Sequence, residues 1–595
     1  MGQGVLKHGM RTLKTIMIVA LFLLYSSASA WAGDIDYTVA IAGVEDSVLK
    51  SSLEEKSLLI RLADKKPETI AALNRRIEND LNALKTVMQE NGYYGASLAS
   101  DIADESGKKK ITIRIEKGPI YTVGSFNLHW KKEKPPEIDA LAALEFPVGD
   151  PALPGAILDA EQNVLTVLMQ NGFPFPRTET RKLSVNHGNR KIAVDLFIDP
   201  GSAARFGPAQ ITGLETLEEP FVKRRVSIWQ EEDFNIQKIA GTRKSLTRSG
   251  VISSVDVEYG DITENGQMPI VLDITESKHR SIGAGAAYST TRGPVSNVFW
   301  EHRNLFGQAE KLRVKGEIGT ETYALAADMN KPDMFGNTNI SWKNAIEFRQ
   351  ESLEAYDKDT ASASTALNYK YSSTSAVSGG VAAERSRIKE EGEDDETFTM
   401  IAFPVTYRYD GTDNFLNPRE GIRFNLGVTP YQVLNEQNTF IKTDAGASHY
   451  WPVGEKFVWA NRVRAAVIQG QSLDDIPADK RLYAGGGGSV RGYGYQLLGP
   501  LDENNNPTGG RMAFELATEG RVKVTESIEA VAFLEGGRVS EDLNFSTSTD
   551  FLWGAGTGMR YHTSVGPLRA DIAVPLDKRN PDNAFQFYIS LGQAF

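Results

Sequence analysis

The N-terminal half of the chain carries three stretches in which apolar residues recur every three or four positions, the spacing of one face of an α-helix. A glycine follows each stretch: Gly92, Gly172 and Gly250, which stand 80 and 78 residues apart. The apolar stripes are Leu73, Ile77, Leu81, Leu84 and Met88; Ile157, Val164, Leu165 and Leu168; and Ile236, Ile239 and Leu246. Because a glycine in this position is a common left-handed helix cap, the repeat predicts three copies of one small module.

Each copy closes on a segment in which apolar and polar residues alternate, as in a half-buried strand. These segments are residues 111–115, 192–198 and 269–274, and the second and third copies also open on strands, at 121–126 and 206–213. A strand, helices and two closing strands in about 80 residues predict an α/β module with one helical layer on a sheet. We place the three modules at residues 34–118, 119–201 and 202–277.

From Ser281 onward the helical period disappears and alternation takes over, for example at residues 311–318, 422–426 and 585–591. Membrane barrels use about 10 residues per tilted strand plus turns, so about 16 antiparallel strands fit into residues 278–595. Such a barrel has to close, because lipid cannot satisfy open strand edges. The predicted fold class is therefore multidomain: three small α/β modules followed by a transmembrane antiparallel β-barrel. A soluble β-sandwich or propeller would explain the alternation alone.

Residues 1–32 have the layout of a secretory signal peptide, with three basic residues before an apolar run at 16–25. Small-x-small patterns permit cleavage after Ala30 or Ala32. The apolar run is too short for a spanning helix, and no apolar run of 18 or more residues follows residue 32. An exported chain with a β-rich C-terminal half favours the barrel and predicts a bacterial outer-membrane protein with its modules in the periplasm.

Composition argues against several classes of function. The 595 residues contain no cysteine, and the seven histidines form no H-x-H or H-x-x-x-H pair. The formal charge of −12 argues against nucleic-acid binding, which needs a concentrated basic surface. Neither a G-x-x-x-x-G-K loop nor a G-x-S-x-G elbow occurs. We therefore expect no enzyme activity, no catalytic residue, no metal site and no cofactor.

One glycine-rich segment, Gly485–Tyr493 (GGGGSVRGY), is unlike the alternating strands around it. Its four successive glycines let another part of the chain approach the backbone closely. Arg491 follows on a tight turn, and an arginine that faces inward needs a carboxylate partner. We predict that Glu535 is this partner. The alternative is an ordinary surface turn.

The order of these features resembles the BamA/TamA outer-membrane insertase superfamily over essentially the whole mature chain. The modules resemble POTRA domains, with Lys117-Gly118-Pro119 as a typical closing pattern. Two segments match the family's V-R-G-Y signature in the loop inside the barrel and its F-x-D-x-G motif in the barrel wall. The matching residues are Val490, Arg491, Gly492 and Tyr493 in the loop and Phe533, Glu535 and Gly537 in the wall. Glu535 stands where the family usually has aspartate, and three modules are typical of the TamA branch, in the bacterial surface antigen family.

The C-terminal strand ends on an aromatic residue, which resembles the recognition signal of bacterial outer-membrane proteins. In the family, the proposed route for a client is a lateral seam between the first and last barrel strands. Glycines would weaken strand pairing there because they offer no side chain for packing. The residues that we assign to the seam and to the C-terminal signal are Gly283, Gly285, Tyr588, Leu591, Gly592 and Phe595.

The resemblance implies an assembly factor that inserts and folds β-barrel clients such as autotransporters without nucleotide hydrolysis. The partners it implies are outer-membrane lipid, unfolded clients and a TamB-like inner-membrane-anchored protein at the modules. The modules have exposed sheet edges that could accept an extra strand, or they act only as spacers. The nearest alternative function is a two-partner-secretion-type pore that exports a soluble exoprotein.

Overall fold

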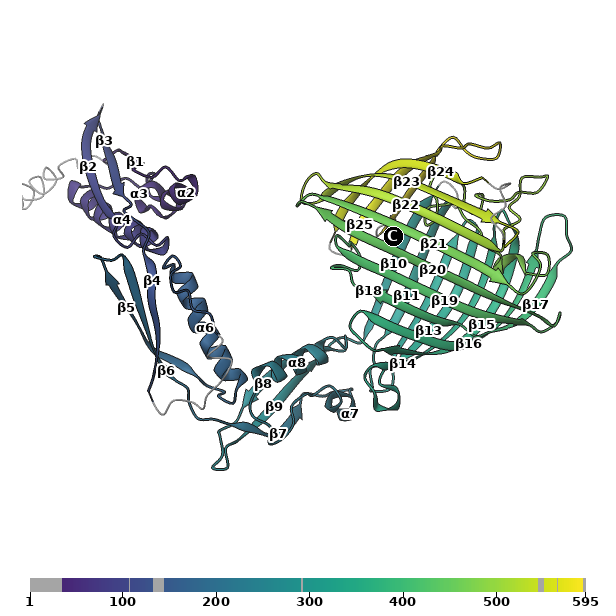
Figure 1. The fold of residues 1–595 in the computed structure, drawn as a ribbon, viewed down its shortest axis with the longest axis horizontal. Coiled ribbons are helices and arrows are strands. Elements are labelled where there is room, and N and C mark those ends of the chain that lie inside the picture. The colour runs from purple at the N-terminus through teal and green to yellow at the C-terminus, as the bar shows by residue number, and fades with distance from the viewer. Residues whose placement is uncertain are drawn as a thin grey trace, which may run out of the picture. The chain divides into compact units, whose positions relative to one another are not determined.

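A computed structural model describes residues 35–105, 107–131, 144–289, 293–543, 550–563 and 566–591 (Figure 1). They form two compact units. The first unit extends to residue 209 and includes 228–240 and 259–270, and the second contains 210–227, 241–258 and 271–595. The expected signal peptide, residues 1–32, lies outside the described residues. In the part of the chain that the structure describes, no helix is both long enough and apolar enough to cross a membrane.

Three small mixed sheets precede the barrel, as the repeat predicts, with strand orders β1-β3-β2, β4-β6-β5 and β7-β9-β8. In the first two sheets the central strand runs parallel to the first strand and antiparallel to the other. The first sheet and its helices are β1 (Tyr37–Ala42), α2 (Ser47–Lys56), α3 (Leu58–Arg61), α4 (Ile70–Glu90), β2 (Ser97–Glu105) and β3 (Lys108–Glu116). The second set is β4 (Thr122–Trp130), α6 (Pro154–Gln170), β5 (Arg177–Asn186) and β6 (Lys191–Asp199). The third set is β7 (Arg205–Thr212), α7 (Glu219–Lys223), α8 (Ile236–Thr247), β8 (Ile252–Tyr259) and β9 (Gln267–Glu276).

The apolar stripes account for how each helix packs on its sheet. In α4, Leu73, Ile77, Leu84 and Met88 are buried against the apolar face of β3. The helix begins at a Thr69 cap, whose side chain accepts a hydrogen bond from the backbone N–H of the residue three positions on. The predicted glycine caps are also confirmed, since Gly92, Gly172 and Gly250 have φ angles of 85°, 94° and 75°.

The C-terminal region closes into an antiparallel barrel from β10 to β26. β17 (Glu396–Ala402) and β18 (Val405–Asp410) both pair with β16 and β19, so they are two halves of one strand. The strand breaks at Pro404, because proline has no N–H to donate to the ladder. Counted this way, the described residues form the 16 strands that the sequence predicts.

The remaining barrel strands are continuous and lie next to one another in chain order. They are β10 (Arg280–Ser289), β11 (Gly293–His302), β12 (Lys311–Gly319), β13 (Thr322–Lys331), β14 (Ile340–Ser352), β15 (Asp357–Lys370), β16 (Ser375–Lys389), β19 (Gly421–Val433), β20 (Asn438–Val453), β21 (Phe457–Gln469), β22 (Met512–Lys523), β23 (Ile528–Ser540), β24 (Leu552–Thr563), β25 (Gly566–Pro575) and β26 (Gln586–Leu591). Two short 3-10 turns lie between strands, η1 (Met334–Gly336) and η2 (Ala478–Lys480).

Alternate residues of each barrel strand face the lumen and the outside. In β23, Phe533 and Glu535 are buried on the inner face, whereas Leu534 between them is 39% exposed on the outer face. The outer face of the neighbouring strands is also apolar, with Leu516 and Met559 as examples. An apolar exterior around a polar interior is the arrangement of a membrane barrel.

The barrel closes at a short seam between its first and last strands. Within the described residues, β10 and β26 are joined through two residue pairs, Tyr288 with Ile589 and Ser289 with Tyr588. By contrast, ten pairs join β10 to β11. Of the two pairings of β10, the one described with β26 is the shorter, and residues 592–595 lie outside the described residues.

A single carboxylate anchors the end of the third module. Glu276 accepts hydrogen bonds from the backbone N–H groups of Glu215, Thr216 and Leu217 at 2.8, 2.9 and 2.8 Å. Its second oxygen accepts a hydrogen bond from the Thr216 hydroxyl and contacts His279 Nε2 at 2.9 Å. Burial acts to raise the pKa of Glu276, but these hydrogen bonds together outweigh burial and hold the pKa at about 2.

Because the pKa of Glu276 is lowered in the folded protein, its contribution to stability decreases in acid. The ordinary value is 4.5, so the stabilisation by ionised Glu276 is fully present above pH 4.5 and is lost as the pH falls through about 2. At neutral pH, Glu276→Gln removes the charge, and we expect the amides of residues 215–217 to exchange with D2O roughly tenfold faster, as expected for weaker hydrogen bonds to this side chain. Hydrogen-exchange mass spectrometry measures this, with Glu264→Gln as an exposed control. Wild-type exchange in Glu276→Gln would contradict the anchoring role.

Candidate functional site

The long connection between β21 and β22, residues 470–511, folds into the barrel lumen. Short antiparallel bridges hold it together, between Leu482 and Gly510 and between Ala484 and Leu498. Its apolar side chains join one buried cluster with inner-face residues of the wall. The members from the connection are Ile476, Ala478, Leu482, Ala484, Val490, Tyr493 and Leu498, and those from the wall include Ile388, Met400, Val433, Phe440, Ile468, Ala513 and Val539. We call residues 470–511 the lumenal loop.

The glycines of the lumenal loop let its tip lie directly against the wall. Gly485 and Gly492 have φ angles of 104° and 106°, which side chains rarely tolerate. A Cβ on Gly492 would also lie 2.7 Å from the carbonyl oxygen of Val574 on β25. The wall contributes matching small residues, since a Cβ on Gly537 would lie 3.0 Å from the Val490 side chain. The loop and wall motifs therefore fit together by close approach of their backbones.

Arg491 is completely buried at the tip of this loop, where it binds three carboxylates. Its backbone N–H donates to Glu535 Oε2 at 2.7 Å, and its Nε and Nη2 donate to Glu535 Oε1 at 3.0 and 2.6 Å. Nη1 donates to Asp571 Oδ2 at 2.7 Å, and Nη2 donates to Glu519 Oε2 at 2.9 Å. The guanidinium carbon also lies 3.3 Å from the ring centre of Phe533, a cation–π contact. The side chain is thus bound on its edge and on its face.

Three further arginines of the wall balance these carboxylates. Arg521 donates to Glu519 at 2.7 Å, and Arg560 lies 3.6 Å from the same residue. Arg560 and Arg569 both bind Asp571. Each of these side chains is at most 5% exposed. Buried charges are expensive unless they are paired and hydrogen-bonded, and alternating the two signs meets this condition. We call Arg491, Glu519, Arg521, Glu535, Arg560, Arg569 and Asp571 the charge cluster.

The lumenal loop also contacts the strand that borders the seam. The Tyr493 hydroxyl donates to the Trp553 carbonyl at 3.0 Å on β24, and the Tyr588 hydroxyl of β26 donates to the Tyr493 carbonyl at 3.4 Å. A Cβ on Gly487 would lie 2.9 Å from the Tyr588 ring. Arg569 adds a hydrogen bond of 3.0 Å from the wall to the Gly487 carbonyl. The loop is therefore fixed to β26 as well as to the charge cluster.

The predicted contact between Arg491 and Glu535 is present. Glu535 reaches the backbone and the side chain of Arg491 together, so the longer carboxylate found here in place of aspartate makes the contact. Gly283 and Gly285 lie on the inner face of β10, beneath the side chains of Phe299 and Asn297 on β11. Contact with these side chains explains why both positions are glycine, because a Cβ at either position would meet them.

The residues predicted for the last strand fall into two groups. Tyr588 is buried and contacts the loop as described, and Leu591 pairs with Leu568 of β25. Gly592 and Phe595 lie outside the described residues.

Sequence reasoning missed most of the charge cluster. Glu519 and Asp571 were not assigned as partners of Arg491, nor Arg521 and Arg569 as partners of these carboxylates, although two i, i+2 pairs, Glu519 with Arg521 and Arg569 with Asp571, place opposite charges on one strand face. Since lipid excludes charge from the outer face, such pairs in a membrane strand have to face the lumen. That pattern could have identified them before the fold was known.

The role of this site is structural: it fixes the lumenal loop to the barrel wall. We call this connection the brace. The carboxylates are all engaged by arginines, and the structure's described residues include no group of three or more His, Asp or Glu side chains placed to hold a metal ion. What the arrangement provides is a rigid connection from the loop tip to β22, β23, β24, β25 and β26 through Glu519, Glu535, Trp553, Asp571 and Tyr588.

Residues 304–595 match the Omp85 superfamily domain. The chain is 24% identical over 410 residues to the outer membrane protein assembly factor BamA of Nitratidesulfovibrio vulgaris, covering 65% of this chain and 50% of that protein. It is 20% identical over 595 residues to BamA of Neisseria meningitidis serogroup B, covering 88% and 73%. The chain thus spans about half the length of the first relative. These relatives are named as assembly factors rather than enzymes.

Among solved structures, the fold is similar to that of BamA from Haemophilus ducreyi lacking POTRA domains 1–3, with a TM-score of 0.67 and 16% identity, covering 79% of this chain and 99% of that one. That likeness concerns the fold alone. The domain match assigns residues 304–595 to the Omp85 superfamily, and the BamA relatives place the chain in the bacterial outer membrane as a β-barrel protein with POTRA-like domains in the periplasm.

Proposed function

We propose that this protein is a TamA-type assembly factor that inserts and folds β-barrel clients, such as autotransporters, into the outer membrane without nucleotide hydrolysis. The observation that carries the proposal is the asymmetry of the seam. The lumenal loop binds the strands on one side of it, β22 to β26, through the charge cluster and Tyr588. On the other side, β10 is held by its pairing with β11 and with β26.

A seam that is braced on its β26 side suits a β-strand template. If β10 separates from β26, its backbone N–H and C=O groups become available to a client strand, and the braced strands keep the rest of the barrel closed. The free energy for insertion would then come from the folding of the client itself.

The POTRA-like sheets support a role in receiving extended chains. β2 and β5 lie at the edges of their sheets, and β5 is exposed along almost its whole length. An exposed edge can add a strand from a partner through backbone hydrogen bonds, with little dependence on sequence. This supports binding of unfolded clients and of a TamB-like inner-membrane-anchored partner at the modules, over a role as spacers.

The assignment to the TamA type depends on the number of modules. Three POTRA-like sheets precede the barrel in the described residues, and three is the number typical of that branch. The two-partner-secretion-type pore is the alternative. The lumenal loop argues against it, because a packed apolar cluster and a neutralised charge cluster occupy the route that an exoprotein would take.

Locking the seam tests the proposed route. Tyr288 and Ile589 face each other across it and are 45% and 42% exposed on the outer face. Directly opposed residues have Cβ atoms about 5 Å apart, close to disulfide reach, and the chain has no cysteine of its own. We expect oxidised Tyr288→Cys/Ile589→Cys to lose insertion of an autotransporter barrel into liposomes, scored by protease protection, and to regain it on reduction.

The matched control is Val463→Cys/Leu516→Cys, which locks β21 to β22 away from the seam. It should insert the client in both redox states. Full insertion by the oxidised seam variant would refute the lateral route. If the same locked protein conducted ions or exported a soluble exoprotein through the lumen, the pore alternative would be favoured.

Removing Arg491 tests the brace. Arg491→Ala leaves three carboxylates facing three arginines, and breaking a buried pair in this way costs about 3–5 kcal/mol. Because the strand ladder is intact, we expect a folded barrel with a lumenal loop that exchanges hydrogen much faster and client insertion that is at least roughly tenfold slower. Hydrogen-exchange mass spectrometry and the liposome assay measure these two effects.

Arg464→Ala is the control, because Arg464 pairs with Asp444 and Glu515 on the wall. It should keep the loop protected and insertion near the wild-type rate. An Arg491→Ala protein with a mobile loop but wild-type insertion would show that the brace has no part in assembly.

A further inference from the structure

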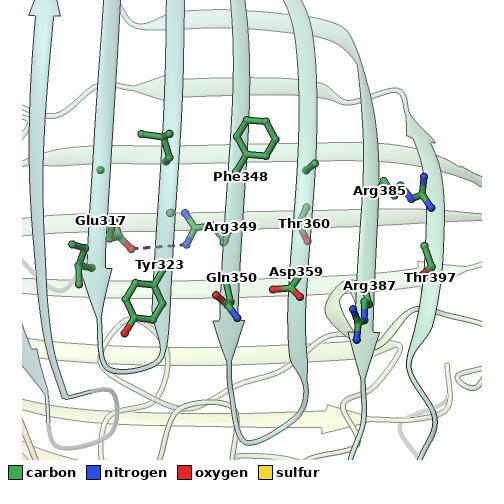
Figure 2. Close-up of a pocket in the computed structure, with 15 residues that line it drawn as sticks. Glu317, Tyr323, Phe348, Arg349, Gln350, Asp359, Thr360, Arg385, Arg387 and Thr397 are labelled. Atoms are coloured by element: carbon green, nitrogen blue, oxygen red, sulfur yellow. Dashed lines mark ion pairs between the residues drawn. The ribbon is translucent and has the colours of Figure 1, made fainter.

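The lipid-facing surface of the barrel has a groove over β12 to β17 (Figure 2), with a volume of about 760 Å³. Side chains from neighbouring strands form two rows across it in register. One row contains Ile318, Tyr323, Gln350, Asp359, Arg387 and Thr397, and the other contains Gly316, Leu325, Phe348, Ala361 and Arg385. Glu317 and Arg349, paired at 3.9 Å, alternate with these residues along their strands and so belong to the inner face.

The hollow results from the sizes of the side chains in the second row. Gly316 and Ala361 leave space beside Leu325 and Phe348, which are 55% and 57% exposed. Ile318, at 65% exposed, extends the same apolar surface. The floor of the groove is therefore suited to a hydrocarbon chain.

One end of the groove carries two arginines in different electrostatic surroundings. Arg387 is paired with Asp395 and lies directly opposite Asp359. Arg385, two residues closer to the middle of β16, is exposed on the same outer face, and no ion pair or hydrogen bond joins it to another residue in the part of the chain that the structure describes. The two Cα atoms are about 7 Å apart, since successive strand residues rise about 3.3 Å.

The depth of Arg385 in the membrane follows from the strand register. The outer-face tyrosines Tyr409 and Tyr407 lie opposite Ser375 and Val377 near the periplasmic end of β16, and such aromatic residues mark the membrane interface. Arg385 is 8 to 10 residues further along the strand. At a tilt of about 40° each residue rises about 2.5 Å along the membrane normal, which gives about 20–25 Å, close to the height of the apolar band. Arg385 therefore lies at the outer interface, where lipid phosphates lie.

We propose that this groove binds a phosphate-bearing lipid of the outer leaflet. Arg385 donates charge-assisted hydrogen bonds to the phosphate, and the acyl chain lies over Leu325 and Phe348. A lipid phosphate supplies the partner that the exposed guanidinium lacks among the described residues. The position favours lipid over a soluble protein, because the floor of the groove faces the hydrocarbon.

The test uses the full chain purified in detergent, supplied with a bisphosphorylated lipid A or with the same lipid after phosphatase treatment. Native mass spectrometry measures how much of each remains bound. Arg538→Gln is the matched control, because Arg538 is an arginine on the outer face near the extracellular end of β23, outside the groove. A heat-modifiability gel confirms that each variant is folded.

We expect the wild type and Arg538→Gln to retain the phosphorylated lipid at least roughly fivefold better than the dephosphorylated one, and Arg385→Gln to lose this preference. Arg385→Lys should retain part of it, because it keeps the charge without the bidentate geometry. Equal retention of both lipids by the wild type would overturn phosphate recognition. Equal retention by Arg385→Gln and the wild type, the result expected if a protein covered this face instead, would overturn the site.

Discussion

A fully buried guanidinium in a lipid-embedded barrel is stable only if carboxylates surround it, and the arrangement of the last five strands follows from this requirement. Arg491 draws Glu519, Glu535 and Asp571 from three different strands to one point. Those carboxylates in turn need Arg521, Arg560 and Arg569, because three negative charges facing one positive charge would repel one another. The cluster therefore fixes strand spacing from inside the lumen, in addition to the ladder of backbone hydrogen bonds.

This interior brace changes what the seam can do. A barrel held only by its ladder would resist opening at every strand pairing, the closure of β10 on β26 included. The lumenal loop adds attachment on the β26 side through Tyr588, while β10 is held by its pairing with β11 and with β26. Opening at this place then leaves the charge cluster intact, because none of its members lies on β10.

Most of the architecture could be predicted from the sequence because it depends on periodicity. The stripe from Leu73 to Met88 and the cap at Gly92 are local signals, and the structure confirms both. The pairing of Arg491 with Glu535 could be proposed because both belong to short motifs. Asp571 and Glu519 could not be placed beside Arg491, since their approach depends on how far the lumenal loop reaches into the lumen. Similarly, the break at Pro404 depends on which neighbours the strand pairs with.

Along each barrel strand, residues that face the lumen alternate with apolar residues that face the lipid. Charged residues that are buried in the lumen or exposed to lipid need partners in addition to the backbone hydrogen bonds of the strand ladder. On the inner face, these charges are buried away from water, and they are neutralised within the protein by the charge cluster. On the outer face, Arg385 departs from an apolar row that contains Leu325 and Phe348. The neighbouring outer-face arginine, Arg387, is paired with Asp395, whereas no described residue forms an ion pair or hydrogen bond with the Arg385 side chain. We therefore expect the charge of Arg385 to be satisfied by the membrane, so the two faces of one wall place the brace inside and the proposed lipid contact outside.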